Sequence, residues 1–287
     1  MKPVSYVGPM PPLYHLVKEL LEHDEPLSAR AVLDAAPWAV RTSPWVEDMK
    51  LVCNAQLAHV DDPELYWRMY GAYWAERESI PLPQPVLPEY SQFQRFRPAM
   101  QLVTERPGCT FLDVGSYDGW LTNRAGLAGA RSFGVDCSVT GVALANAKAA
   151  EFNTGAQHAL CRFGLDPLPD HFPQQYEVLS CMEVYEHCPD TGALCRLLRS
   201  LVAPGGVCLL TTPHGSWLRG LSGTIGYGPH WDCLQPREHV RAPTPEAVRA
   251  DLLRAGFASV DVTTWLTDQS AQPEKIHGQA TLVVVAR

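Results

Sequence analysis

The chain has 287 residues, of which 46% are hydrophobic and 19% charged, and its formal net charge is −8 at pH 7. This composition is typical of a soluble globular protein, and the length fits one large domain or a core domain with a smaller companion. The acidic balance disfavours nucleic acid as a partner, because a long phosphate backbone binds basic surfaces.

The first 88 residues are predicted to form a helical region of their own. Apolar residues recur with helical spacing over 12–24, and a second helix is expected to start at Ser28 as its N-cap and to stop before Pro37. Two further helices follow, and a proline-rich linker ends the region. The last helix carries a Tyr/Trp stripe, which is either helix-packing core or the wall of a substrate pocket. We expect this region to be a substrate cap or an assembly element.

From about residue 98 the pattern changes to alternating strands and helices. The expected strands cover 110–114, 132–136, 158–163, 176–182 and 206–212, with helices over 120–128, 139–152 and 191–202. Such alternation is typical of a parallel sheet with helices on both faces. A helical pattern over 243–257 precedes two strands, 258–266 and 280–286, which no helix separates. This pair predicts an antiparallel last strand.

A glycine-containing loop ends the first of these strands. Asp113 lies at the strand end, and Gly115 and Gly119 bracket Ser-Tyr-Asp before the helix begins. In an open α/β sheet, ligands bind beyond the carboxyl ends of the strands, where glycines permit close backbone approach and tight strand-to-helix packing. Asp113 and Asp118 would repel a pyrophosphate, which disfavours a dinucleotide oxidoreductase and favours a cationic ligand with an amino-acid head. Asp136, at the end of the second strand, can accept both hydroxyls of an adenosine ribose.

These segments resemble, in order, the motifs of class I S-adenosylmethionine-dependent methyltransferases, and the similarity is greatest to the branch with the ubiquinone-biosynthesis O-methyltransferases. The motifs are "LDVGSYDG", "GVDCS", "CMEVYEHCPD", "LVAPGGVCLLTTPH" and "EHVRAPTPEAVRADLLRAGF", within about residues 92–287. The resemblance implies a Rossmann-like α/β fold with a seven-stranded, mostly parallel sheet, in a domain over 89–287. It also implies S-adenosylmethionine as cofactor and S-adenosylhomocysteine as product.

The resemblance implies a set of cofactor-binding residues. They are Asp113, Gly115, Ser116, Tyr117, Asp118, Gly119, Asp136, Cys137, Phe163 and Met182. The chain departs from the family pattern at two places. Tyr117 stands where a middle glycine is usual, and the usual acid after the third strand is missing, so that Phe163, Gly164 and Asp166 are the nearby candidates for adenine contacts.

The fourth strand runs into an E-x-x-E-H motif, Glu183, Glu186 and His187, above the reactive end of the expected cofactor. Methyl transfer to a hydroxyl requires an in-line geometry and the removal of one proton. His187 is the expected base, because histidine ordinarily titrates near working pH; the alternative is that these residues cap the following helix. With His239 the motif also resembles the magnesium site of small-RNA 2′-O-methyltransferases, although the same spacing occurs in relatives without an assigned metal.

The long irregular segment 214–239 is predicted to be a lid or a substrate wall. Its candidate substrate contacts are His214, His230 and Trp231, with plain loop packing as the alternative. The sequence thus favours O-methylation of a small molecule such as a sugar, phenol or natural product. N- or C-methylation, and a module that binds the cofactor without reacting, stay open, as does a homodimer.

The compartment is expected to be the cytoplasm. Nine cysteines are scattered without a C-x-x-C pair, which is typical of buried side chains in a reducing compartment. The N-terminal stretch lacks the apolar region of a signal peptide, and no apolar run approaches the about 20 residues that span a bilayer. We therefore expect no membrane partner.

Overall fold

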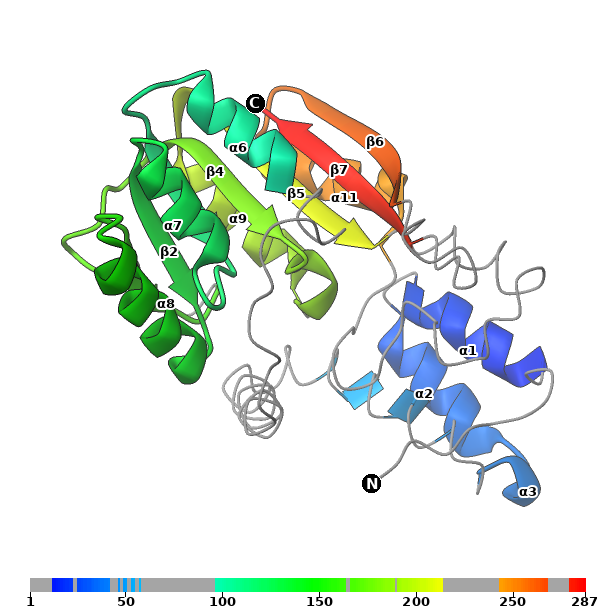
Figure 1. Cartoon of the computed structure of the whole chain (residues 1–287). Coiled ribbons are helices and arrows are strands. Elements are labelled where there is room, and N and C mark those ends of the chain that lie inside the picture. Colours follow the sequence, from blue (N-terminus) through cyan, green and yellow to red (C-terminus); the bar gives the residue numbers. More distant parts are fainter. Residues whose placement is uncertain are drawn as a thin grey trace.

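The computed structural model describes residues 12–22, 25–41, 96–163, 166–188, 190–213, 243–267 and 279–287, and six positions between 46 and 57. A seven-stranded sheet, with helices packed against it, organises the described residues from 96 onward (Figure 1). The strands are β1 (Thr110–Val114), β2 (Arg131–Asp136), β3 (Gln157–Leu160), β4 (Tyr176–Met182), β5 (Val202–Pro213), β6 (Val260–Thr267) and β7 (Gln279–Ala286). The helices that cover it are α6 (Arg97–Thr104), α7 (Trp120–Leu127), α8 (Val139–Phe152), α9 (Thr191–Leu201) and α11 (Pro245–Arg254).

The strand order is β3-β2-β1-β4-β5-β7-β6. Neighbours from β3 to β5 are parallel, whereas β7 runs antiparallel to both β5 and β6. The predicted mostly parallel sheet with an antiparallel last strand is therefore confirmed. The chain proceeds outward from β1 to β3 and then returns to β4, so the switch point in strand order lies between β1 and β4, where ligands of such sheets bind.

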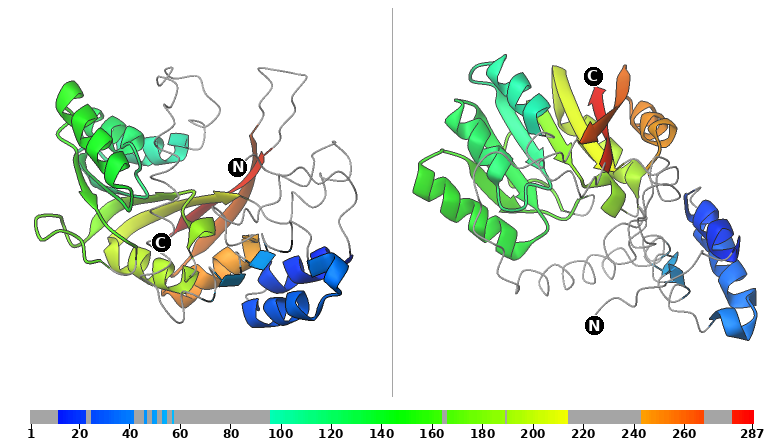
Figure 2. Two further views of the ribbon diagram at one scale, coloured as in Figure 1. Left: turned by 90° about the horizontal axis from the view of Figure 1, so that it is seen from below. Right: turned by 45° about the vertical axis from the view of Figure 1, so that its right-hand side comes forward.

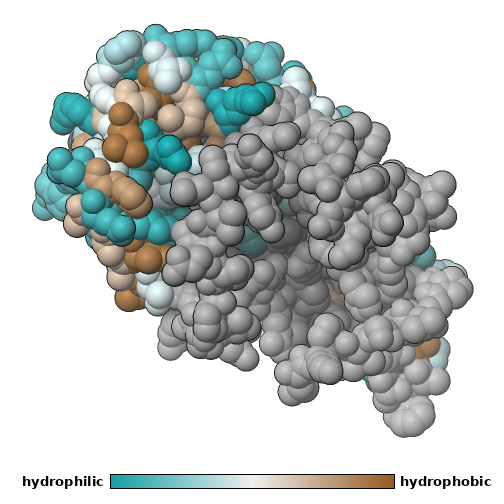
Figure 3. All heavy atoms as spheres, in the orientation of Figure 1, coloured by the Kyte–Doolittle hydropathy of each residue, from teal (hydrophilic) through white to brown (hydrophobic). Residues whose placement is uncertain are grey.

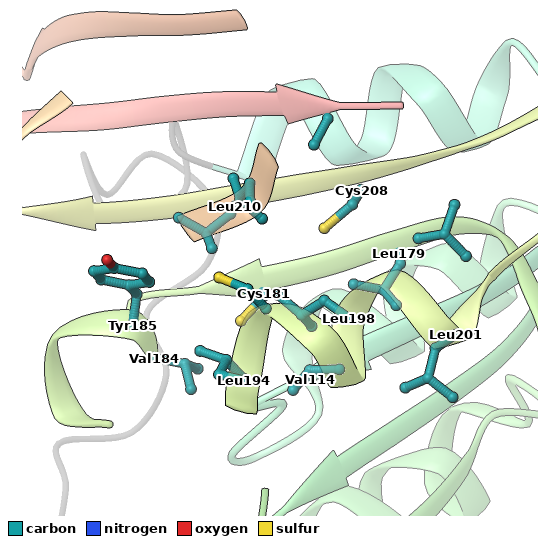
Figure 4. Packing of buried hydrophobic residues seen from close by; sticks show 14 of the residues in the cluster. Val114, Leu179, Cys181, Val184, Tyr185, Leu194, Leu198, Leu201, Cys208 and Leu210 are labelled. Atoms are coloured by element: carbon teal, nitrogen blue, oxygen red, sulfur yellow. The ribbon is translucent and has the colours of Figure 1, made fainter. Parts of the chain in front are cut away.

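Helices cover both faces of the sheet (Figure 2). α6, α7 and α8 pack on one face, and α9 and α11 pack on the other. Adjacent residues of β5 illustrate the division, since Val207 and Leu209 belong to the core on the first face and Cys208 and Leu210 to the core on the second (Figure 4). Because the central strands are buried on both faces, their sequences are continuous runs of apolar residues.

The N-terminal helices α1 (Pro12–Glu22) and α2 (Pro26–Ala35) pack together, and α3 (Trp38–Arg41) follows. Tyr14 and Val17 of α1 meet Leu33 of α2 in a hydrophobic cluster of the N-terminal region. The expected N-cap, Ser28, was wrong. The helix starts at Pro26, whose fixed φ and missing N–H suit the first turn, so Ser28 lies inside the helix. The Tyr/Trp stripe lies outside the described residues, and the boundary after residue 88 stays a prediction.

The third strand is shorter than the sequence predicted. Its last pairing joins Leu160 to Asp136, the final residue of β2, and the N–H of Cys161 still donates to the Asp136 carbonyl. Beyond this point β2 has turned toward α8, so the predicted strand residues after 160 have no neighbouring strand to pair with. β5 is longer than predicted, because it begins at Val202 directly after α9.

The described surface mixes hydrophilic and hydrophobic residues (Figure 3). Several exposed apolar side chains belong to α8, namely Val139, Leu144 and Phe152. Seven of the eight described cysteines are buried, and Cys137 is half-buried. Within the described parts of the chain, each helix is too short or too polar to cross a bilayer.

Candidate cofactor and active site

The loop between β1 and α7 contains three residues with left-handed backbone conformation. Their φ angles are 80° at Gly115, 42° at Tyr117 and 72° at Gly119. A Cβ at Gly119 would lie 2.6 Å from Cε1 of His158 and 2.7 Å from Cβ of Ala145. Gly119 therefore permits the tight packing that the sequence suggested. Tyr117, where the resemblance implies a glycine, adopts a glycine-like conformation that is strained for a large side chain.

Gly115 lies against the loop that follows β4. A Cβ at this position would lie only 2.2 Å from Cγ2 of Val184, a buried residue of that loop. The sequence predicts that a ligand approaches where the side chain is missing, and the structure adds that Val184 requires the same space. Gly115 thus sets the spacing between the two loops at the switch point.

Asp136 ties the glycine loop to the end of β2. One carboxylate oxygen accepts the N–H of Tyr117 and the other accepts the N–H of Ser138, each at 2.8 Å. The residue is 7% exposed. The carboxylate expected to hold the ribose therefore also sets the position of the loop.

The structure compensates two acids that the sequence leaves exposed to each other, Asp113 on β1 and Asp118 in the loop. Asp113 is buried, accepts hydrogen bonds from the hydroxyls of Ser180 (2.6 Å) and Thr122 (3.1 Å), and burial raises its pKa to about 7. Asp118 forms an ion pair with Lys148 of α8. The sequence alone predicts two uncompensated carboxylates. In the structure burial favours the neutral form of Asp113 and Lys148 pairs with Asp118, so this argument against a pyrophosphate is weaker than expected.

The region after β3 contains the remaining cofactor candidates. Phe163 packs against the core on the α9 and α11 face. Asp166, a candidate for the missing adenine acid, accepts hydrogen bonds from the N–H, Nε and Nη2 of Arg162 at 2.7–2.9 Å, which lower its pKa. Gly164 lies outside the described residues. At the end of β4, Met182 is buried, and its sulfur lies 3.3 Å from the hydroxyl oxygen of Thr211.

Consecutive threonines of β5 hold the two acids of the E-x-x-E-H motif. The hydroxyl of Thr211 donates to Oε1 of Glu183 at 2.9 Å, and the hydroxyl of Thr212 donates to Oε2 of Glu186 at 2.8 Å. Adjacent strand residues point to opposite faces, so the two carboxylates are held from opposite sides of β5. Glu183 has a φ of 57°, a strained state that clusters at functional sites.

His187 and Glu186 form the close pair of the motif, on the short 3₁₀ turn η2 (Tyr185–His187). Nε2 of His187 lies 3.8 Å from Oε1 of Glu186, and the two side chains are 14% and 1% exposed. The nearly buried carboxylate thus lies next to the imidazole, within ion-pair distance but beyond direct hydrogen-bond length.

Four expected site residues fall outside the described residues. They are His239 of the possible metal site and the substrate candidates His214, His230 and Trp231. Among the residues that the structure does describe, no three His, Cys, Asp or Glu side chains are close enough to hold a metal ion.

A family model for methyltransferase domains matches residues 89–262, which is more than half of the chain. The chain belongs to this family of S-adenosylmethionine-dependent methyltransferases. Over 143 residues, 47% of the chain, it is 30% identical to the ubiquinone biosynthesis O-methyltransferases of Yersinia pestis (strain Pestoides F) and Yersinia pseudotuberculosis serotype O:1b (strain IP 31758). The chain spans 58% of the length of these relatives.

Solved methyltransferases share the fold. An S-adenosylmethionine-dependent methyltransferase from Mesorhizobium loti matches with a TM-score of 0.52 and 19% identity, over 69% of this chain and 99% of the other. The magnesium protoporphyrin IX methyltransferase of Synechocystis PCC 6803, solved with bound S-adenosylhomocysteine, matches with a TM-score of 0.51 and 17% identity, over 79% and 100% of the chains. The expected class I fold is confirmed.

In this methyltransferase the turn that carries the motif is anchored to α11. The carboxylate of Asp251 accepts the hydroxyls of Tyr185 (2.6 Å) and Thr191 (2.5 Å), and it also pairs with Arg254. Tyr185 projects from the turn beside the core in Figure 4. The sequence does not predict this anchor, because no local pattern pairs residues that lie 66 positions apart.

Proposed function

We propose that this methyltransferase transfers the methyl group of S-adenosylmethionine to a hydroxyl of a small molecule. The observation that carries the proposal is the His187–Glu186 pair, which follows β4 at the switch point. In the proposed reaction the acceptor oxygen forms a bond to the methyl carbon as the carbon–sulfur bond breaks. The acceptor proton passes to the His187 imidazole, and the Glu186 carboxylate orients the ring and stabilises its charged form.

The described residues fit the cofactor. S-adenosylmethionine supplies an activated methyl group when it is bound. The glycine loop would lie along its methionine part, with Gly115 and Gly119 leaving out side chains for which there is no room. Asp136, already fixed by the N–H groups of Tyr117 and Ser138, would accept the ribose hydroxyls. The arrangement at the switch point of the sheet supports this placement.

The acceptor is proposed to be a phenol, a sugar or a natural product. The net charge of −8 suits a small neutral or cationic molecule better than a polyanion, and the similarity to relatives named as O-methyltransferases supports oxygen as the accepting atom. The N-terminal region would cover the acceptor. Deletion of residues 1–88 is then expected to preserve cofactor binding and to abolish acceptor turnover.

The test has two stages. Calorimetric titration with S-adenosylhomocysteine and, separately, with NAD should give binding of the first alone. Methyl-labelled S-adenosylmethionine is then incubated with panels of phenols, sugars and amines, and the labelled products are identified by mass spectrometry. Label on oxygen supports the proposal. Binding of NAD alone, or label on nitrogen or carbon only, contradicts it.

A further inference from the structure

The imidazole of His158 lies buried beneath the glycine loop. His158 belongs to β3 and is 8% exposed, and within the described residues neither of its ring nitrogens has a hydrogen-bond partner. Burial lowers its pKa to about 4, so the ring is neutral near pH 7, with one N–H and one acceptor nitrogen. A buried polar group without a partner is destabilising, and native structures usually supply one.

The His158 ring packs against the backbone of the β1–α7 loop and of β2 at two glycines, in the space that side chains there would occupy. A Cβ at Gly119 would lie 2.6 Å from its Cε1, and a Cβ at Gly134 of β2 would lie 2.6 Å from its Nδ1. The same point at Gly134 is 2.8 Å from Oγ of Ser116 and 2.9 Å from Oγ1 of Thr122. Polar groups from β3, from the loop and from α7 therefore converge on one glycine of β2.

Ser116 is the loop residue of this group. It is 6% exposed, and its hydroxyl also has no partner within the described part of the chain. Thr122 is already engaged, because its hydroxyl donates to Asp113. The groups that can satisfy one another are thus the Ser116 hydroxyl and the His158 imidazole, which make no direct hydrogen bond. A buried water with two to four polar partners is the usual solution for such an arrangement.

The charged groups around the ring are compensated. Asp118, in the loop, is the charge that acts on His158, and it pairs with Lys148 of α8. Asp113, on β1, is held by Thr122 and by Ser180 of β4. The ring is therefore fixed by shape and hydrogen bonding, with no ion pair of its own among these groups.

We propose that His158 is a positioning residue for cofactor binding, which holds the loop between β1 and α7 through a water molecule shared with Ser116. This inference rests on the proposed cofactor site. The water would accept or donate a hydrogen bond at the ring and at the hydroxyl, so that β3 supports the loop from beneath. Loss of the polar ring would loosen the loop and weaken cofactor affinity, without removing a group that takes part in methyl transfer.

The experiment measures S-adenosylhomocysteine affinity by calorimetry. His158→Phe keeps most of the ring volume but removes both nitrogens, and it should weaken binding at least ten-fold. His158→Asn keeps a polar atom near the position of Nδ1 and should stay within about three-fold of the wild type. The control is His171→Phe at an exposed histidine, which should leave affinity unchanged. Thermal unfolding verifies that each variant is folded.

A double-mutant cycle separates this role from general destabilisation. Ser116→Ala should weaken binding by a factor similar to that of His158→Phe, and the double variant should be little worse than either single variant. The inference is wrong if a folded His158→Phe variant binds like the wild type. It is also wrong if the fold-losses in affinity of the two single variants multiply in the double variant, because the two side chains then act independently. If His158→Phe does not fold, Ser116→Ala decides in its place, and unchanged affinity of Ser116→Ala overturns the inference. A wild type that does not bind S-adenosylhomocysteine would instead refute the proposed cofactor site.

Discussion

The hydroxyl of Tyr185 donates a 2.6 Å hydrogen bond to the carboxylate of Asp251 and so joins the turn after β4 to α11. Tyr185→Phe should lower the free energy of unfolding by about 1–3 kcal/mol, because it removes one donor from a buried carboxylate. Tyr176→Phe is the matched control, since the Tyr176 hydroxyl is buried without a partner in the described residues. Urea unfolding should show little loss, or a gain, for the control. Equal losses in both variants would contradict the assigned role of the bond.

Gly115→Ala should weaken S-adenosylhomocysteine binding strongly, because the new Cβ would collide with the Val184 side chain. Adding Val184→Ala tests the cause. Recovery of affinity in the double variant would show that the glycine serves the contact between the two loops. No recovery would assign the loss to the ligand or to the φ of 80°, which is strained for a residue with a side chain. Gly129→Ala controls for backbone strain, because Gly129 also has positive φ but has no atom within 4 Å of the added Cβ.

Asp136→Ala should cost on the order of 2–3 kcal/mol in binding free energy, since it removes charge-assisted hydrogen bonds to the proposed ribose and the two that hold the backbone. Calorimetry with S-adenosylhomocysteine measures the loss. Asp170→Ala, at an exposed acid, should leave the affinity unchanged. Unaltered binding by Asp136→Ala would move the proposed ribose site elsewhere.

The stability of the fold should depend on pH through Asp113. Its folded pKa of about 7 lies above the value of about 3.9 for an unfolded aspartate. Between about pH 4 and pH 7 the folded state therefore holds a proton on Asp113 that the unfolded state has lost. The stability that this proton contributes is complete below about pH 4 and is lost as the pH rises through about 7. Asp113→Asn stays neutral. Urea unfolding between pH 4.5 and 8 should show the variant gaining on the wild type as the pH rises, and a constant difference would contradict the shift.

His187→Ala should lower the turnover of an identified acceptor by about 10²–10⁴, because it removes the proposed base. Affinity for S-adenosylhomocysteine should stay close to that of the wild type, since His187 is not among the proposed cofactor residues. Glu186→Gln should cause a smaller loss, because it keeps the shape of the group that orients the ring. Full turnover by His187→Ala would contradict the role of His187 as base and would leave the positioning of acceptor and methyl group as the source of catalysis. A loss of activity with EDTA that magnesium restores would favour the metal hypothesis.

The amino-acid sequence determined the features that depend on local pattern. The boundaries of β1 and α8 agree with those predicted, because apolar periodicity and the flanking residues record them directly. The glycine loop, Asp136 and the E-x-x-E-H motif could be located for the same reason, since each is a short run next to a strand end. Boundaries failed where the tertiary structure intervened, as at β3, which ends when its neighbour β2 turns away.

Only the tertiary structure decided which partners these residues have. Lys148 offsets Asp118 from α8, Val184 excludes a side chain at Gly115, and His158 enters from β3 beneath the loop. Each contact joins segments that are far apart in the chain, and strand order brings them together. Hydrophobic burial sets that order through many weak contacts at once. A short stretch of sequence therefore does not indicate which distant side chain will contact it. The sequence located the site, and tertiary packing determined which charges in it are paired and which side chains hold its loop in place.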